Sequence, residues 1–393
     1  YSLNLSPHPL QTIFICLAGG CLGVLFLIPL RRYFVRETHG EHPYPVATAI
    51  TEVLVTGEKG GAQAKLLIQA TVIAGLYDFF VTTFRVWKEF VDFQFIPLVK
   101  QAADKAKVVC QFDAIAFILG LGYVMRLRSS MILCAGGVLS NFVLVPLLFY
   151  LGSHFPDVVP PGTKAISEMT ANQIFRGYVR FIGVGAIATA GIFGILKSLK
   201  VVMGSFGIAI KAFRHGEGHI ELARTDRDIS IMTMLIGTVV TSILALVFFG
   251  TLGAGGYAAV VVGLALMLVF SFFFTSVAAN AIATTARNPV SGMTMLTIMI
   301  SSVVLLKFGL SGPTGMFFVM AIAGMVCTAL SVSGQTVTDL KTGYWLGSTP
   351  AVQERWKFVG VIAASIAVGL TIVMLSKLYF FGDAPDGTAP EKI

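Results

Sequence analysis

The chain has 393 residues, of which 55% are hydrophobic and only 12% are charged, and its mean hydropathy is +0.82. So few charges cannot cover a water-facing surface, which excludes a soluble globular protein and indicates an all-α polytopic membrane protein. The net charge of +8 does not indicate a nucleic-acid partner, because the cations cluster at the ends of apolar runs and form no dense basic stretch.

About ten runs are long and apolar enough to cross a lipid bilayer, since a spanning helix needs about 20 mostly apolar residues. They fall near 12–29, 66–87, 111–125, 130–152, 173–196, 229–250, 254–277, 292–309, 314–333 and 357–379. The third run is short, with Asp113 near its start and Arg126 after its end, so a half-helix is the alternative to a full crossing.

The distribution of cations predicts the sidedness of the loops. If the third run crosses, the basic segments after the first, third, fifth and ninth spans share one side, whereas the loops at 153–170, 250–256 and 309–313 carry almost no cations. Lys and Arg stay on the cytoplasmic side, so the basic side is predicted to be cytoplasmic. The loop at 88–110 disagrees, because it is predicted to be external yet contains four lysines.

Cysteine and histidine spacing predicts neither a disulfide framework nor a metal site. The five cysteines lie in or beside apolar runs and form no CxxC pair. His215 and His219 are four residues apart, but the glycines at 216 and 218 favour a solvated loop over a metal-binding helix face. No His-Glu-x-x-His or Gly-x-Ser-x-Gly motif is present, so we expect neither a cofactor nor an enzyme.

Two polar segments form an internal repeat. Residues 52–61 and 339–347 share an acid, an apolar residue, Thr-Gly and a further Gly, and a long apolar run follows each. An even number of predicted spans separates them, which places both on one side of the membrane. This predicts a parallel repeat, an arrangement known among secondary transporters. Within a single transmembrane domain of 1–393, residues 1–152 are expected in the first half and 173–379 mostly in the second.

Four segments follow one another along the chain: Pro43-Tyr44-Pro45 with Thr51 to Gly61, then Arg224 to Asp228, Asn288 to Thr294, and Asp339 to Pro350. Together they resemble the oligopeptide transporter (OPT) family, and within it the prokaryotic members related to the plant yellow stripe-like carriers. Family members are usually much longer, so we expect this chain, which begins at Tyr1, to correspond to the middle of a longer protein.

The resemblance implies secondary active transport in a bacterial inner membrane, usually driven by protons. The implied substrates are short peptides or metal complexed to peptide-like chelators, and the implied partners are protons, the lipid bilayer and, as a homo-oligomer, further copies of the chain. The alternatives are a channel-like or structural membrane protein, or an inactive fragment of a transporter. No acidic ring or filter-like sequence supports a channel.

The segment that begins at Asn288 is the first candidate for contact with a substrate. Pro289 lacks a backbone donor and Gly292 loosens the helix start, which leaves the Asn288 amide facing a cavity at a helix N-terminus suited to a carboxylate. The alternative is a plain turn at the cytoplasmic interface. The expected substrate-binding residues are Asn288, Ser291, Thr294, Tyr44 and Gln335.

Glu52 is the only carboxylate between Pro43 and Gly57, and a carboxyl group removed from water can carry a proton near neutral pH. It is therefore the first candidate for the coupling proton, with Asp339 as the second, although an exposed interfacial carboxylate is an equal alternative. Asp339 and Lys341 form either part of a gate or a solvated ion pair that contributes little. The expected gating residues are Lys341, Thr342 and Gly343.

Arg176 and Arg180 lie four residues apart at the start of the fifth predicted span. Residues with this spacing share one face of a helix, where both guanidinium groups could meet a substrate carboxylate. Snorkelling to the lipid headgroups is the favoured interpretation.

Overall fold

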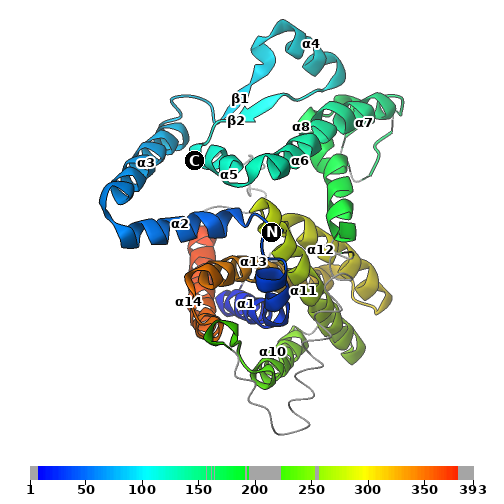
Figure 1. The fold of residues 1–393 in the computed structure, drawn as a ribbon. Coiled ribbons are helices and arrows are strands. Elements are labelled where there is room, and N and C mark those ends of the chain that lie inside the picture. Colours follow the sequence, from blue (N-terminus) through cyan, green and yellow to red (C-terminus); the bar gives the residue numbers. More distant parts are fainter. Residues whose placement is uncertain are drawn as a thin grey trace. The chain divides into compact units, whose positions relative to one another are not determined.

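The structure is a computed structural model that describes residues 8–155, 157–160, 162, 164–190, 193, 223–252 and 256–378. Helices dominate these residues, and strands β1 (Phe90–Asp92) and β2 (Gln111–Asp113) form a small antiparallel sheet in which Phe90 lies opposite Asp113 (Figure 1). The predicted all-α class is confirmed.

Eight helical segments among the described residues are long and apolar enough to cross a membrane. They are Pro9–Glu37, Gly61–Phe84, Leu127–Gly152, Arg224–Thr251, Tyr257–Thr285, Val290–Lys307, Gly312–Leu346 and Pro350–Leu375. The predicted run at 173–196 extends beyond the described residues.

In the predicted run at 111–125, the helix is short: it is α5 (Ala116–Val124), and it follows strand β2. Nine residues at 1.5 Å each reach about 14 Å, roughly half the thickness of the hydrocarbon core. The segment is therefore a half-helix and not a crossing. The predicted sidedness loses the support of that crossing and stays a prediction.

The chain forms two compact units, which are described separately. Unit 1 comprises residues 1–39, 190–282 and 288–393. Its described helices are α1 (Pro9–Arg31), η1 (Arg32–Glu37), η7 (Arg224–Asp226), α10 (Ile231–Thr251), most of α11 (Tyr257–Thr285), α12 (Val290–Lys307), α13 (Gly312–Leu346) and α14 (Pro350–Leu378).

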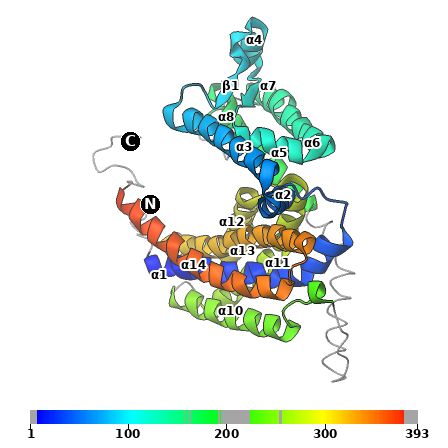
Figure 2. The same cartoon turned by 60° about the vertical axis from the view of Figure 1, so that its left-hand side comes forward.

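Helix α13 forms the centre of unit 1, where it packs against α1, α12 and α14 (Figure 2). The contact with α1 is close, because a Cβ atom at Gly19 or Gly23 would collide with the backbone of Met325 or Ala329 on α13. Small residues allow helix backbones to approach in this way inside membranes. Buried residues continue along α13 as far as Gly343.

Helix α13 is longer than the predicted span at 314–333. It continues to Leu346 and ends at Gly347, whose left-handed backbone (φ 71°) suits a residue without a side chain. The segment from Asp339 to Leu346 is therefore helical, so the alternative of a solvated Asp339–Lys341 pair in a loop is wrong. Thr338 and Thr342 donate their hydroxyls to the carbonyl oxygens of Gly334 and Thr338, one turn earlier, so these polar groups are satisfied within the helix.

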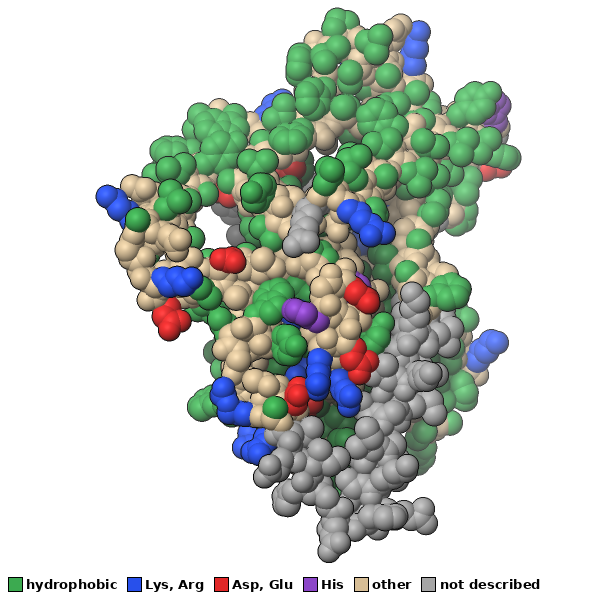
Figure 3. Space-filling view, in the orientation of Figure 1, with side chains coloured by type: hydrophobic (Ala, Val, Ile, Leu, Met, Phe, Trp, Pro, Cys, Tyr) green, Lys and Arg blue, Asp and Glu red, His purple; other side chains and the backbone are tan. Residues whose placement is uncertain are grey.

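Unit 2 comprises residues 40–189 and 283–287. Its helices are α2 (Pro45–Lys59), α3 (Gly61–Phe79), η2 (Phe80–Phe84), η3 (Phe93–Phe95), α4 (Pro97–Ala106), α5, α6 (Arg126–Val138), η4 (Leu139–Leu144), α7 (Val145–Gly152), η5 (Ile166–Glu168), α8 (Ala171–Ile174) and η6 (Phe175–Val179), with β1 and β2 between them. Helix α3 buries none of its side chains, and Leu66, Ile68 and Ile73 are each more than 60% exposed. Apolar side chains therefore cover much of the surface (Figure 3), as expected for contact with lipid tails.

The two segments of the internal repeat have similar local structures. Glu52 lies in α2, which ends at Gly60 (φ 64°), and Asp339 lies in α13, which ends at Gly347 (φ 71°). Each acid precedes its terminal glycine by eight residues, and another helix follows. Two superposable halves remain a prediction, because this similarity is local.

Candidate functional site

The Asn288 segment lies where the chain turns from α11 into α12. Helix α11 ends at Thr285 and α12 begins at Val290, directly after Pro289. Between them Ala286 adopts a left-handed backbone (φ 56°), an uncommon conformation for a residue with a side chain. The chain therefore breaks sharply at this point, as the proline predicts.

Asn288 uses only half of its side-chain amide within the fold. Its Nδ2 atom donates a hydrogen bond of 3.0 Å to the carbonyl oxygen of Leu330 on α13. Its Oδ1 atom is buried and has no hydrogen-bond donor within the described part of the chain. Gly334 makes room for the amide, because a Cβ atom there would lie 2.7 Å from Nδ2.

The other two candidates in this segment differ from Asn288. Ser291 is exposed in the first turn of α12. Thr294 donates its hydroxyl to the carbonyl oxygen of Val290 at 2.7 Å, so this donor is already used within the helix. Ser291 thus remains accessible to a ligand, whereas Thr294 offers only an acceptor.

Gln335 lines a cavity of about 500 Å³ in unit 1, which is within the size range of small-molecule sites. Its lining residues come from α1, α12, α13 and α14: Cys16, Val290, Cys327, Thr328, Ser331, Val332, Gln335, Thr336, Lys357, Gly360, Val361, Ala364, Ser365 and Val368. The walls are mostly apolar, with an amide, hydroxyls and one ammonium group. Val290, at the start of α12, belongs to this lining together with Gln335 on α13. The Asn288 segment therefore leads directly to the wall of the same cavity.

Lys357 brings a positive charge to the edge of this cavity. Its Nζ atom forms an ion pair with Asp339 on α13, and both side chains are between a quarter and a third exposed. The sequence had suggested a pair between Asp339 and Lys341. In the structure Asp339 pairs instead with Lys357 on α14. At this exposure the pair contributes little to stability, but it fixes the ammonium group beside the cavity.

Lys341 is buried, with 1% of its surface exposed. Its Nζ atom donates to the carbonyl oxygen of Val35 at 2.6 Å and lies 3.1 Å from Nδ1 of His39. The rings of Tyr344 and Trp345 lie 5.3 and 5.5 Å from the same nitrogen, within the range of cation–π attraction. Lys341 thus fastens the end of α13 to the segment that follows α1.

The remaining gating candidates are also packed. Thr342 is buried and donates its hydroxyl to the carbonyl oxygen of Thr338 at 3.1 Å. A Cβ atom at Gly343 would collide with Gln353 and with Ser348. Gly343 therefore allows the chain that enters α14 to approach the end of α13, whereas Thr342 bonds within α13.

Tyr44 and Glu52 belong to unit 2. Tyr44 is buried, adopts a left-handed backbone (φ 42°) before Pro45, and donates its N–H to the carbonyl oxygen of Ala283 at 2.9 Å. Burial raises the pKa of the Tyr44 phenol, so it stays neutral at physiological pH. Glu52 is exposed on α2, which matches the interpretation of an exposed carboxylate.

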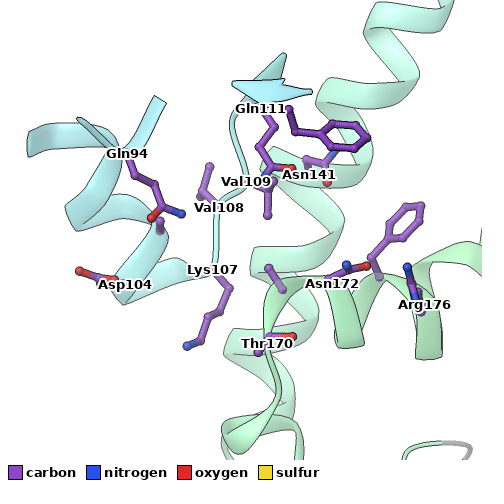
Figure 4. Close-up of a pocket in the computed structure, with 14 residues that line it drawn as sticks. Gln94, Asp104, Lys107, Val108, Val109, Gln111, Asn141, Thr170, Asn172 and Arg176 are labelled. Carbon is purple, nitrogen blue, oxygen red and sulfur yellow. The ribbon is translucent and has the colours of Figure 1, made fainter. Parts of the chain in front are cut away.

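A second cavity, of about 600 Å³, lies within unit 2 (Figure 4). Its polar lining combines both signs of charge with several amides: Gln94, Asp104, Lys107, Gln111, Asn141, Thr170, Asn172 and Arg176. Thr170 is held by a capping box with Gln173 at the start of α8. Of the two arginines considered in the sequence, Arg176 therefore lines a cavity.

No group of three or more His, Cys, Asp or Glu side chains that could hold a metal ion occurs within the described ranges. His215 and His219 lie outside those ranges. The sequence did not identify Lys357, which looked like one more cation marking a helix end. Its spacing gives no signal for the ion pair, because Asp339 lies on a different helix.

The fold and these cavities define a multi-pass α-helical membrane protein with polar groups gathered between its helices. Residues 1–391 match the family model described as OPT oligopeptide transporter protein, so the chain belongs to the oligopeptide transporter family.

Two relatives illustrate the range of the family. The chain is similar to a proposed oligopeptide transporter of Haemophilus influenzae, with 28% identity over 405 residues that cover 95% of this chain and 60% of that protein. It is also similar to the metal-nicotianamine transporter YSL1 of Arabidopsis thaliana, with 23% identity over 382 residues that cover 93% of this chain and 54% of that protein. The chain thus spans less than two thirds of either relative.

Proposed function

We propose that the protein carrying this chain is a secondary active transporter, a proton-coupled symporter that imports oligopeptides or peptide-like metal chelates across a bacterial inner membrane. The observation that carries the proposal is the family match over residues 1–391. Peptides and metal chelates are both retained because the two relatives are named for one each. A homo-oligomer stays a prediction.

The cavity at Gln335 is our candidate for the substrate site. A peptide presents amide groups, to which the Gln335 side chain can both donate and accept hydrogen bonds. It also presents a carboxylate, which can bind the ammonium group of Lys357. The apolar walls suit side chains of varied size, because they impose few directional contacts. We infer that the free Oδ1 atom of Asn288 takes part when α13 and α12 shift around the substrate.

The mixed charges of the unit 2 cavity also suit a zwitterionic peptide. Lys107 and Arg176 offer cations for a carboxylate, and Asp104 offers an anion for an amino group (Figure 4). We assign this cavity as a second candidate for substrate contact.

The coupling proton and the gate remain proposals from the sequence. Glu52 is the first candidate for proton binding and Asp339 the second. Lys341, Thr342 and Gly343 are proposed to act together, since their contacts fix the end of α13. Substrate entry would then require the Lys341 contacts with Val35 and His39 to change.

Reconstituted proteoliposomes test the proposal. Uptake of a radiolabelled tripeptide and of a labelled metal–nicotianamine complex is measured with and without an inward proton gradient. We expect the gradient to drive accumulation of at least one of them, and Gln335→Ala to weaken uptake. Equal, passive equilibration under both conditions would indicate a channel, and no uptake of either compound would indicate a structural role.

A further inference from the structure

Three charged side chains from distant parts of the sequence meet inside unit 1. Arg31 closes α1, Asp228 precedes α10, and Glu354 lies in the first turns of α14. The Nη2 atom of Arg31 donates to Oδ2 of Asp228 at 3.1 Å, and its Nε atom contacts Oδ1 of the same carboxylate. The pair is thus a two-pronged guanidinium–carboxylate contact.

Glu354 completes the cluster and is fully buried, with 0% of its surface exposed. Its Oε2 atom accepts a hydrogen bond of 2.8 Å from the N–H of Ile229. Its Oε1 atom is buried and has no donor among the described side chains while both carboxyl groups are ionised. Because Ile229 directly follows Asp228, the hydrogen bond from Ile229 places the Glu354 carboxyl group beside the segment that carries the Asp228 carboxylate.

The cluster contains one positive group, the Arg31 guanidinium, and two carboxyl groups. One guanidinium balances one carboxylate, and a second ionised carboxylate on the fully buried Glu354 would be an uncompensated charge. Two carboxyl groups in contact avoid this cost when one of them carries a proton, because the O–H group then donates to the other carboxylate. The same proton gives the orphaned oxygen a partner.

Among the described residues, the other cations on the surrounding elements pair elsewhere or are exposed, whereas Glu354 is fully buried. Arg36 pairs with Asp226 at 2.9 Å, Arg32 lies 3.2 Å from Glu37, and Lys357 pairs with Asp339. Lys341 donates to Val35, and the side chains of Arg227 and Arg355 are exposed.

We propose that Asp228 and Glu354 hold one proton between them, clamped by Arg31, and that this proton-binding site joins α1, the start of α10 and α14. The proton resides on Oε1 of Glu354 and donates to Asp228. The Asp228 side chain is 28% exposed, so it connects the buried carboxyl group to water. When the proton leaves to water, the cluster gains a negative charge and the three segments lose part of their attachment.

The site is independent of the proposed transport cycle, and its test needs no substrate. The purified protein is examined by infrared spectroscopy for the carbonyl stretch of a protonated carboxyl group, and by thermal unfolding across a pH series. We expect the band at neutral pH in the wild type and its loss in Glu354→Gln. Because the folded protein keeps a proton that the unfolded chain releases above about pH 4, the wild-type Tm should fall as pH rises from there through neutral, and level off once the folded site has also lost its proton.

Glu354→Gln keeps the acceptor for Ile229 and supplies an uncharged donor to Asp228. Its Tm should therefore equal or exceed that of the wild type at neutral pH and no longer fall as pH rises through this range, whereas Glu354→Ala should have a lower Tm than Glu354→Gln at every pH. Glu58→Gln, an exposed glutamate on α2, is the matched control and should leave both the band and the pH profile unchanged. The proposal is overturned if the wild type lacks the band, or if Glu354→Gln loses as much Tm as Glu354→Ala.

Discussion

The side-chain nitrogen of Asn288 donates to the carbonyl oxygen of Leu330 at 3.0 Å, while the oxygen of the same amide is buried and has no donor in the part of the chain that the structure describes. One end of the amide is therefore structural, and the other is a buried acceptor without a donor, which we propose binds the substrate when the surrounding helices shift. This division allows the two roles to be separated by substitution.

Asn288→Ala should weaken both the fold and substrate binding. It removes the donor to Leu330 and the free acceptor, and the loss of one buried polar partner costs about 1–3 kcal/mol. In proteoliposomes, substrate exchange and accumulation should fall together, and direct binding should weaken about tenfold or more. Ser291→Ala, an exposed change in the same segment, is the control for stability. Unchanged binding in Asn288→Ala would remove this residue from the site.

Substitutions of Lys357 and of Asp339 should change the binding of a peptide carboxylate in opposite directions. Lys357→Met removes the ammonium group at the Gln335 cavity, so binding of a peptide with a free C-terminal carboxylate should weaken. Asp339→Asn releases that ammonium group from its partner, so the same binding should strengthen. Amidated and free forms of one peptide, compared by calorimetry, measure both effects. Equal responses of the two forms would show that the pair does not contact the carboxylate.

Gly23→Ala should destabilise the protein although Ala is a better helix former than Gly. A Cβ atom at Gly23 would collide with the backbone of Ala329, which cannot move aside as a flexible side chain can. Overpacking of this kind costs about 1–3 kcal/mol, which exceeds the roughly 1 kcal/mol gained from helix propensity. Gly75→Ala on α3 is the control, because no atom lies within 4 Å of its Cβ position, and thermal unfolding should show opposite shifts for the two variants.

The length of the apolar runs was sufficient to predict most of the helices, because a spanning helix can be recognised from its apolar composition alone. It could not predict that α13 continues to Leu346. The polar side chains of Asp339 and Lys341 suggested a loop, whereas Lys357 and the carbonyl of Val35 satisfy them within a helix. Those partners lie on other helices, and a single sequence does not reveal such pairings.

The sequence likewise predicted the local structure of the candidate site but not its contacts with distant segments. The Asn-Pro pair predicted a break before α12 because proline restricts the preceding residue and removes a donor. The contact between Asn288 and α13 depends on the missing side chain at Gly334, 46 residues further along the chain. The Arg31–Asp228–Glu354 cluster joins still more distant segments, and each of its members looked like an ordinary charge at a helix end.

Glu52→Gln tests whether this carboxylate binds the coupling proton. The amide mimics a permanently protonated side chain, so substrate exchange should persist while accumulation against a gradient is lost. Exchange needs only the loaded carrier to reorient, whereas accumulation needs the proton to leave inside the cell. Glu58→Gln, another exposed position on α2, should retain both activities. Full proton-driven accumulation by Glu52→Gln would exclude Glu52 as the proton site, and Asp339→Asn would then be the next variant to compare in the same assay.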